Sequence, residues 1–171
     1  MHIRANGFTL RRPISICGID KEKGTLRIVF EVRGEGTAEL TRLNEGELID
    51  MLAPLGHGFT VDGNLDKVIL IGGGIGTPPM LPLAKIYGVK AVAISGFRNA
   101  SAVILQDDFK RTGADTVLCT DDGSAGYHGF VTDPLAKELE NGGIGMVYAC
   151  GPMPMLKRIA AMCAEKNVPC E

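Results

Sequence analysis

Tryptophan is absent from this chain of 171 residues, aromatic residues make up only 5% of it, and there are three histidines. None of the five cysteines forms a C-x-x-C pair, which argues against a metal site within the chain. No run approaches the roughly 18 apolar residues of a membrane helix. A formal net charge of −2 gives no electrostatic reason to bind nucleic acid. We therefore expect a protein that binds no metal, no nucleic acid and no membrane.

The amino terminus and the cysteines indicate where the protein works. Met1-His2-Ile3-Arg4 lacks the apolar core of a secretory signal. The number of cysteines is odd, and they are spread from Cys17 to Cys170, so a disulfide framework is not indicated. We expect reduced thiols and a cytoplasmic location.

The two halves of the sequence differ in pattern. Up to about residue 63, turn-rich stretches separate three β-prone segments, at 13–19, 25–33 and 47–52. A short helix is expected over 38–43, with Thr37 as its N-cap. Beyond residue 63, apolar strands alternate with helix-like stretches. The expected strands are 68–71, 90–95, 115–119 and 145–149, and the expected helices are 80–87, 101–112, 132–140 and 153–166. This alternation predicts a parallel sheet covered by helices, and hence two domains, 1–63 and 64–171.

A glycine loop (residues 72–77) follows the first of those apolar strands and precedes a helix. Bare backbone N–H groups beside a helix N-terminus favour a phosphate. The loop is not the usual dinucleotide fingerprint, because Pro79 stands where a third glycine should be. The next strand also runs into Gly96-Phe97-Arg98 instead of ending in an acidic residue. A turn without a ligand is the alternative.

Two motifs in the first half are candidate anion sites. Arg12-Pro13-Ile14-Ser15 offers a planar, permanently charged guanidinium and a small hydroxyl. Gly36 and Thr37 place bare backbone near the start of a helix. The alternatives are a surface arginine and simple helix capping.

Two loops follow later strands of the second half, at the carboxyl edge where parallel sheets bind ligands. Asp121 and Asp122 could accept hydrogen bonds from ribose hydroxyls, or could belong to a solvated turn. A Cys-Gly-Pro turn (residues 150–152) places a thiol and bare backbone at the same edge. A thiol enzyme is disfavoured, and a buried, inert Cys150 is the simpler alternative.

The fixed order of these motifs resembles the ferredoxin–NADP⁺ reductase superfamily. Three stretches look most like the electron-transfer subunits of dihydroorotate dehydrogenase B. They are Leu10-Arg11-Arg12-Pro13-Ile14-Ser15-Ile16, Thr120-Asp121-Asp122-Gly123-Ser124 and Gly129-Phe130-Val131-Thr132. The resemblance covers nearly the whole chain.

The resemblance implies an electron-transfer flavoprotein of pyrimidine biosynthesis, an oxidoreductase that passes a hydride from NADH to FAD. Electrons would then leave singly through a [2Fe–2S] cluster to FMN in a dihydroorotate dehydrogenase catalytic subunit, within a heterotetramer. The implied FAD residues are Arg12, Pro13, Ile14, Ser15, Val29, Phe30, Glu31, Gly36 and Thr37. The implied NAD(H) residues are Gly72, Gly73, Gly74, Gly76, Thr77, Asp121, Asp122, Cys150, Gly151 and Pro152, with Cys150 beside the nicotinamide.

Both ends of the chain depart from the family pattern. Only eleven residues precede Arg12, where the family has two to three further strands, and no set of four cysteine ligands for the cluster is present. We therefore expect an incomplete antiparallel β-barrel flavin domain ahead of an α/β nucleotide-binding domain, truncated at both ends and without ligands for the cluster. Two alternatives stay open. One is a flavin or diaphorase subunit of a ferredoxin:NAD(P) oxidoreductase or hydrogenase, and the other is a nucleotide-binding module without turnover.

Overall fold

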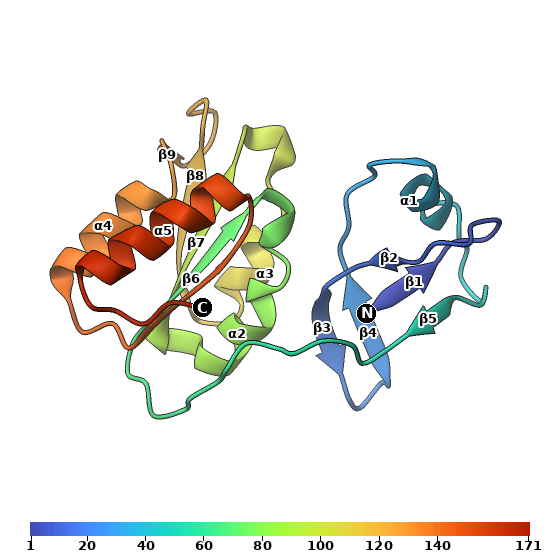
Figure 1. The fold of residues 1–171 in the computed structure, drawn as a ribbon, viewed down its shortest axis with the longest axis horizontal. Coiled ribbons are helices and arrows are strands. Elements are labelled where there is room, and N and C mark those ends of the chain that lie inside the picture. Colours follow the sequence, from blue (N-terminus) through green and yellow to red (C-terminus); the bar gives the residue numbers. More distant parts are fainter. The chain divides into compact units, whose positions relative to one another are not determined.

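A computed structural model describes all 171 residues, and the chain divides into two compact units, Met1–Gly58 and Phe59–Glu171 (Figure 1). The domain boundary suggested near residue 63 lies a few residues beyond this division. The intervening segment packs on the second unit, as described below.

The second unit is built on a five-stranded parallel sheet (Figure 1). In spatial order its strands are β10 (Met146–Cys150), β6 (Val68–Gly73), β7 (Ala91–Phe97), β8 (Asp115–Thr120) and β9 (Tyr127–His128). Strand β6 is buried along its whole length, as expected of a parallel strand whose two faces are both covered. The predicted parallel sheet with flanking helices is confirmed.

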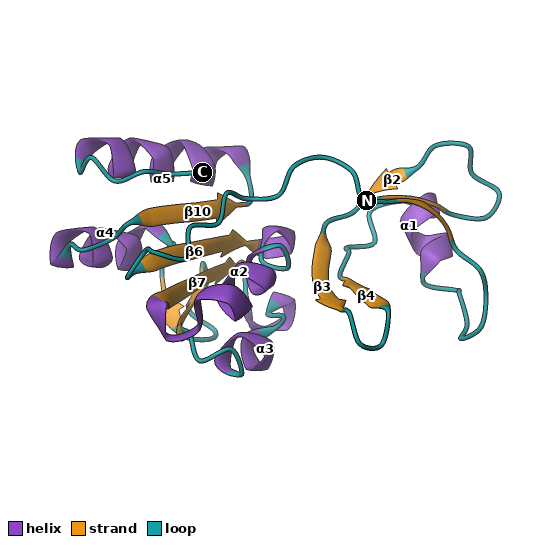
Figure 2. Cartoon of the chain, turned by 90° about the horizontal axis from the view of Figure 1, so that it is seen from below, coloured by secondary structure: helices purple, strands orange, loops and turns teal.

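Helices cover both faces of this sheet. They are α2 (Met80–Tyr87), α3 (Gln106–Lys110), α4 (Thr132–Asn141) and α5 (Met153–Glu165). Helices α4 and α5 lie on one face, and α2 and α3 lie on the other (Figures 1 and 2). Ile69 and Ile94 of the sheet pack with Leu135 of α4 and Ile159 of α5 in one buried cluster. Burying each such side chain contributes about 1.5–3 kcal/mol, so the contacts among these four residues hold α4 and α5 firmly on the sheet.

The helix expected over 101–112 is broken in the structure. A 3₁₀ turn (Ala100–Ala102) precedes α3, and Leu105 between them has a φ of 63°. An L-residue in this left-handed conformation cannot continue a right-handed helix, so α3 begins only after it.

The last residues of the chain lie along the outer edge of β10. The Val147 amide donates to the Pro169 carbonyl at 2.9 Å, and the Glu171 amide donates to the Val147 carbonyl at 3.0 Å. The Ala149 amide donates in turn to the Glu171 carbonyl at 2.9 Å. Residues 169–171 therefore protect the edge of β10 by parallel pairing, which the sequence did not indicate.

A buried tyrosine fastens the start of the second unit to its sheet. The Tyr148 hydroxyl lies 2.9 Å from that of Tyr87 and donates to the Thr60 carbonyl at 2.6 Å. The Phe59 ring packs edge-on against the Tyr148 ring. The Asp62 amide also donates to the Tyr87 hydroxyl at 3.2 Å. These contacts explain why residues 59–62 belong to the second unit.

The first unit contains two small antiparallel sheets and one helix. One sheet has the order β2 (Arg12–Pro13), β1 (His2–Arg4), β5 (Asp50–Leu52), and the other pairs β3 (Ile16–Asp20) with β4 (Thr25–Ile28). Helix α1 spans Glu35–Leu40. The small core of the first unit consists of Ile3, Ala5 and Leu40, with Ile14 and Phe30 packed against them.

Several predicted boundaries in this unit are wrong. The segment expected as a strand over 13–19 is interrupted between β2 and β3, the strand over 25–33 ends at Ile28, and β1 was missed. The helix expected over 38–43 begins three residues earlier, and its N-cap is Gly34 instead of Thr37. The Thr37 hydroxyl folds back to accept hydrogen bonds from the amides of Arg33 (2.9 Å) and Gly34 (3.2 Å), as a side chain inside the first turn can do.

Candidate functional site

The carboxyl edge of the sheet in the second unit contains a topological switch point. From β6 the chain passes through α2 to β7 on one side, whereas β10, the last strand, pairs with β6 on the other side. Open α/β sheets bind ligands at such a point, in the crevice beyond the carboxyl ends of the strands. The glycine loop (residues 72–77) follows β6 there, and the Cys-Gly-Pro turn (residues 150–152) follows β10.

The glycine loop turns sharply between β6 and α2. A 3₁₀ turn (Gly74–Gly76) is closed by a hydrogen bond from the Thr77 amide to the Gly74 carbonyl at 3.1 Å. Gly74 has a φ of +53°, and a Cβ added to it would meet no atom within 4 Å. A Cβ on Gly72 would instead lie 2.5 Å from the Thr77 Cα. Gly74 thus faces open space, and Gly72 lets the loop close on itself.

The glycine loop packs backbone against backbone on the Cys-Gly-Pro turn. A Cβ on Gly76 would overlap the Cys150 carbonyl, and a Cβ on Gly151 would lie 3.2 Å from the Gly73 Cα. A Cβ on Gly73 would lie 2.7 Å from the Met155 sulfur. The residues predicted from two distant parts of the sequence are therefore brought together. Sequence reasoning missed Met155, because no pattern distinguishes it from any other apolar residue of α5.

Two side chains at this junction, those of Thr77 and Cys150, differ in their surroundings. Thr77 is fully buried, and its hydroxyl has no hydrogen-bond partner. Leaving a buried hydroxyl unpaired costs free energy, so a partner supplied by a ligand fits this site. The Cys150 side chain is half-buried, and burial raises the pKa of its thiol. Cys150 is therefore a neutral thiol at the switch point and not an activated nucleophile.

The acidic loop after β8 lies next to the end of β7. The Asp121 amide donates to the Phe97 carbonyl at 3.0 Å, and the Asp122 amide donates to the Arg98 carbonyl at 3.3 Å. The Asp122 carboxylate accepts hydrogen bonds from the Ser124 hydroxyl (2.6 Å) and amide (2.9 Å), and these bonds lower its pKa. The Ser124 hydroxyl in turn accepts from the Ala100 amide at 2.7 Å.

The two carboxylates therefore differ in what they can do. Asp122 is held inside its own loop, and Ser124, which sequence reasoning missed, orients it. The Asp-x-Ser spacing of a side-chain-bonded turn was the available signal. The Asp121 side chain is exposed at the sheet's edge. Asp121 is thus the acid of this pair that remains available to a ligand.

In the first unit, Arg12 and Gly36 come together. A Cβ on Gly36 would lie 2.6–2.9 Å from atoms of the Arg12 guanidinium, so the group rests on the bare backbone of α1. The guanidinium also donates to the Leu10 carbonyl at 2.9 Å and lies 5.7 Å from the centre of the Phe8 ring. This arrangement holds a cation against the first turn of α1.

The other predicted flavin residues in this unit have mixed surroundings. Ile14 and Phe30 pack on the core, Val29 is half-buried, and Pro13 and Ser15 are exposed. Glu31 accepts a hydrogen bond from the Arg33 guanidinium at 2.8 Å. Thr37 donates its hydroxyl to the Gly34 carbonyl at 2.9 Å, so only its backbone remains available to a ligand.

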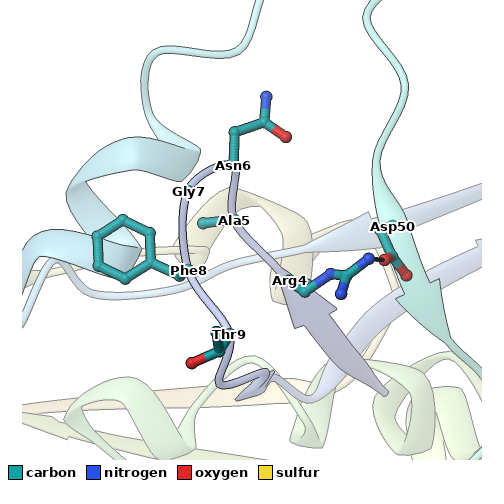
Figure 3. Close-up of a pocket in the computed structure, with 7 residues that line it drawn as sticks. All are labelled: Arg4, Ala5, Asn6, Gly7, Phe8, Thr9 and Asp50. Atoms are coloured by element: carbon teal, nitrogen blue, oxygen red, sulfur yellow. Dashed lines mark ion pairs between the residues drawn. The ribbon is translucent and has the colours of Figure 1, made fainter.

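A depression of about 320 Å³ in the first unit does not coincide with these residues (Figure 3). It is lined by Arg4, Asp50 and the turn between β1 and β2, and it contains none of the predicted cofactor residues. Figure 3 shows Arg4 directed at Asp50, with which it forms an ion pair. The depression therefore lies where β1 and β5 are linked by an ion pair, and it is not the predicted site.

The structure forms no group of three or more His, Cys, Asp or Glu residues that could hold a metal ion. None of its helices is both long and apolar enough to cross a membrane.

Comparisons with known proteins agree with this geometry. The electron transfer subunit of dihydroorotate dehydrogenase B (NAD⁺) from Geobacillus thermodenitrificans is 43% identical over 155 residues, which cover 88% of this chain and 59% of that protein. The same subunit from Bacillus mycoides is 39% identical, covering 98% of this chain and 66% of that protein. An NADH-dependent reduced ferredoxin-NADP oxidoreductase has a solved structure that matches with a TM-score of 0.86 and 31% identity. That match covers 99% of this chain and 62% of that one. No protein-family model matches the chain.

The fold and the joined loops define a chain of the ferredoxin reductase class, with an FAD/NAD-binding type of fold. Within that class, the chain belongs to the family of dihydroorotate dehydrogenase B electron transfer subunits. It spans about three fifths of the length of the first curated relatives it matches.

Proposed function

We propose that this chain binds NADH in its second unit and FAD in its first, passes a hydride from NADH to FAD, and delivers electrons to an FMN-containing dihydroorotate dehydrogenase in the cytoplasm. The observation that supports this most is the junction of the glycine loop with the Cys-Gly-Pro turn at the switch point. The relatives named above are electron transfer subunits of that enzyme.

The glycine loop is the proposed pyrophosphate site. Its amides precede α2, where the helix dipole favours an anion. Gly74 leaves room for close approach of a phosphate, since no atom fills the space that a Cβ would occupy. The unpaired hydroxyl of Thr77 can donate to an oxygen of the nucleotide. Asp121 accepts hydrogen bonds from ribose hydroxyls.

The Cys-Gly-Pro turn is the proposed nicotinamide platform. Its backbone is fixed by packing on the glycine loop, so it positions a ring without the ordering cost of a mobile loop. The Cys150 thiol stays protonated, because burial raises its pKa, and therefore offers an uncharged, polarizable surface. FAD, when bound, accepts the two electrons of a hydride and can release them one at a time.

In the first unit, Arg12 and the backbone at Gly36 and Thr37 are the proposed contacts of the FAD phosphates. The guanidinium keeps donors beyond the one given to the Leu10 carbonyl, and Gly36 lets it lie against α1. The residues present do not fit the [2Fe–2S] cluster of the family, because no three or more His, Cys, Asp or Glu side chains come together as possible ligands, whereas such a cluster needs four. We therefore assign no step to that cluster in this chain.

A ferredoxin:NAD(P) oxidoreductase subunit is the second candidate function. The solved structure of such an enzyme matches nearly the whole chain at 31% identity. The two candidates share the hydride step and differ only in the acceptor that takes the electrons.

Two measurements test the proposal. In the first, the chain is mixed with FAD without oxygen, and NADH is added. Loss of the flavin absorbance band supports the hydride step, whereas unchanged absorbance at saturating NADH contradicts it.

In the second measurement, the dihydroorotate dehydrogenase catalytic subunit or ferredoxin is offered as electron acceptor. Reduction of FMN in the catalytic subunit supports the first candidate, and reduction of ferredoxin alone supports the second. Asp115→Asn, at the opposite edge of the sheet, serves as a control that should leave both rates unchanged.

A further inference from the structure

Two cysteines that are seven residues apart meet where the chain reverses after α5. Cys163 lies in the last part of α5 and is 1% exposed, whereas Cys170 is exposed on the outer strand (residues 169–171). The Val168 amide donates to the Cys163 carbonyl at 2.9 Å, and Asn167 has a φ of 55°, so the chain turns back directly over Cys163.

The sheet places the second thiol independently of this turn. The backbone of Cys170 pairs with that of Val147 of β10 in a parallel β-bridge, and Val147 packs in the same buried cluster as Cys163. The two thiols are close enough to form a hydrogen bond with each other. None of the five cysteines is in a disulfide in the structure.

We propose that Cys163 and Cys170 form a peroxide-sensitive dithiol that closes into a disulfide and fastens the outer strand (residues 169–171) to α5. This inference does not depend on the proposed function, because neither cysteine belongs to the cofactor residues.

Exposure and hydrogen bonding assign the chemical roles. Burial raises the pKa of Cys163 to about 12, so this thiol stays protonated and donates to the Cys170 sulfur. That hydrogen bond opposes the rise that burial causes in the pKa of Cys170. The pKa of Cys170 stays above its usual value, but Cys170 is the exposed thiol of the pair and is therefore the one that meets hydrogen peroxide. Its thiolate forms a sulfenic acid and releases hydroxide. The Cys163 sulfur then attacks the Cys170 sulfur, the S–O bond breaks and water leaves. In sum, two thiols and one peroxide give one disulfide and two waters.

The disulfide would restrict the chain end that protects β10. Closing so short a loop reduces the freedom of the unfolded chain, and a rise in Tm of about 5 °C is expected for a chain of this size. Because the linked strand pairs with Val147 and Ala149, local opening of β10 should also slow.

The test uses the full chain at about pH 9, because burial keeps the pKa of Cys170 above the ordinary thiol value of about 8.5. After hydrogen peroxide treatment, the protein is denatured, alkylated and mapped by mass spectrometry, and its Tm is measured. We expect two fewer alkylated cysteines than in the reduced chain, a linked peptide joining Cys163 to Cys170, and a Tm that rises and then returns on reduction. Cys170→Ser, a change at an exposed position, should abolish the link and the Tm change. Cys17→Ser should retain the link.

Three results would overturn the proposal. One is oxidation of Cys170 to sulfinic acid without a link. Another is a link to a different cysteine or between two molecules. The third is a Tm increase that persists in Cys170→Ser.

Discussion

Two glycines of the glycine loop (residues 72–77) differ in their surroundings, and we expect them to have different roles. Gly74 has a positive φ with open space beside it, which suits a ligand site, whereas Gly76 is packed against the Cys150 carbonyl. The resemblance placed Gly76 among the NAD(H) residues, which stays a prediction. A Cβ on Gly76 would also meet backbone that cannot move aside, so we expect Gly76 to matter for packing as well.

We predict that Gly74→Ala lowers NADH affinity about tenfold, which is about 1.4 kcal/mol, and lowers stability by about 1 kcal/mol through its left-handed φ. Gly142→Ala is the matched control. Gly142 has a φ of +73° with open space beside it, but it lies at the end of α4, far along the chain from the loop. The control should lose similar stability and keep its affinity. Calorimetric titration and denaturant unfolding of both variants give the two numbers, and equal affinities would assign Gly74 to a turn only.

We predict that Gly76→Ala lowers the free energy of unfolding by about 1–3 kcal/mol, since the added Cβ overpacks the junction. Denaturant unfolding of this variant beside Gly74→Ala is the measurement. A smaller loss at Gly76 than at Gly74 would contradict the packing role inferred from the Cys150 carbonyl.

Tyr148 shows how one buried hydroxyl ties together three segments. Burial is the main reason why its pKa lies well above the usual value, and the Tyr87 hydroxyl contributes. The neutral phenol is therefore favoured in the folded state. Its contribution to stability is complete below the unfolded pKa of about 10 and is lost as pH rises above that value.

We predict that Tyr148→Phe lowers the free energy of unfolding by about 1–2 kcal/mol at pH 7, because the Thr60 carbonyl and the Tyr87 hydroxyl each lose a partner. Between pH 9 and 11 the loss should shrink, since Tyr148 of the unfolded parent then begins to ionise, which favours unfolding of the parent, whereas the variant has no such group. Denaturant unfolding at several pH values measures this. Tyr127→Phe, at an exposed tyrosine, should change little, and a loss that is constant with pH would contradict the assignment.

At the scale of elements, ion pairs add to the antiparallel backbone pairing that joins β5 to β1. Asp50 forms ion pairs with Arg4 of β1 and, at 2.7 Å, with Arg11, which also donates to the Asp50 carbonyl at 3.2 Å. The hydrogen bond from Arg11 is the main reason why the pKa of Asp50 is lowered. A lowered pKa gives stability that is present above the unfolded pKa of about 3.9 and is lost as pH falls below it.

We predict that Asp50→Asn lowers the Tm by about 2 °C at pH 7, a modest effect because exposed ion pairs are weak. The difference from the parent should begin to shrink below about pH 4 and disappear below the lowered pKa of Asp50, where the carboxylate of the folded parent is also protonated. Thermal unfolding at both pH values, with Glu45→Gln as an exposed control in the same unit, is the measurement. An undiminished difference in acid would show that the charge of Asp50 is not responsible.

The elements also show what the sequence could predict and why the remainder escaped it. Long apolar strands separated by helices identified β6, β7, β8 and β10, because burial on both faces leaves a continuous apolar run. The rule that ligands gather at the carboxyl edge then related the glycine loop to the Cys-Gly-Pro turn. The short strands β1 and β2 were harder to predict, since two or three residues show no hydrophobic period. Whether such a segment forms a strand depends on the strand that pairs with it.

Two further contacts could not be read in the same way. The Thr37 hydroxyl turns back to the Gly34 and Arg33 amides, a local bond between side chain and backbone that the sequence does not decide, so the helix start was misplaced. The pairing of residues 169–171 with β10 depends on the reversal after α5. This pairing is set by tertiary packing, which overrides local propensity.

At the scale of the whole molecule, the first unit limits what the chain can retain. Its strands form two small open sheets, and Leu48, Met51 and Leu52 at and beside β5 are exposed. Unpaired strand edges and exposed apolar side chains are favourable places for further chain or another molecule to bind. Arg12 and Gly36 can still meet phosphates, but an open sheet encloses little of a flavin.

We predict that FAD dissociates from the isolated chain during gel filtration, whereas NADH still binds to the second unit. The measurement is the ratio of flavin absorbance to protein in the eluted peak, with calorimetry of NADH on the same sample. Flavin retained near one per chain would contradict this expectation and show that the two open sheets suffice.

We expect the charges at the carboxyl edge of the second unit to decide which nucleotide binds more tightly. Backbone hydrogen bonds hold Asp121 and Asp122 beside Phe97 and Arg98, and Asp122 is bonded within its own loop, so a nucleotide ribose placed there would meet the Asp121 carboxylate and one arginine. A 2′-phosphate adds a charge of about −1.5 to −2 and would be repelled by these acidic residues. A single exposed arginine is poorly suited to offset that repulsion, because phosphate recognition uses several charge-assisted hydrogen bonds.

We therefore predict that NADH binds at least about tenfold more tightly than NADPH, a difference of about 1.4 kcal/mol. Asp121→Asn should reduce the ratio of NADH affinity to NADPH affinity, because it weakens NADH binding and removes a charge that repels the 2′-phosphate of NADPH. Arg98→Gln should increase that ratio, because it removes the one cation. Asp115→Asn is the matched control, because Asp115 is exposed at the amino end of the same strand, β8. Calorimetry at one fixed ionic strength compares all four proteins, since salt screens exposed charges. Equal or tighter binding of NADPH by the parent would refute the assignment of the acidic loop to the ribose, and Arg98 would then be the residue that carries the preference.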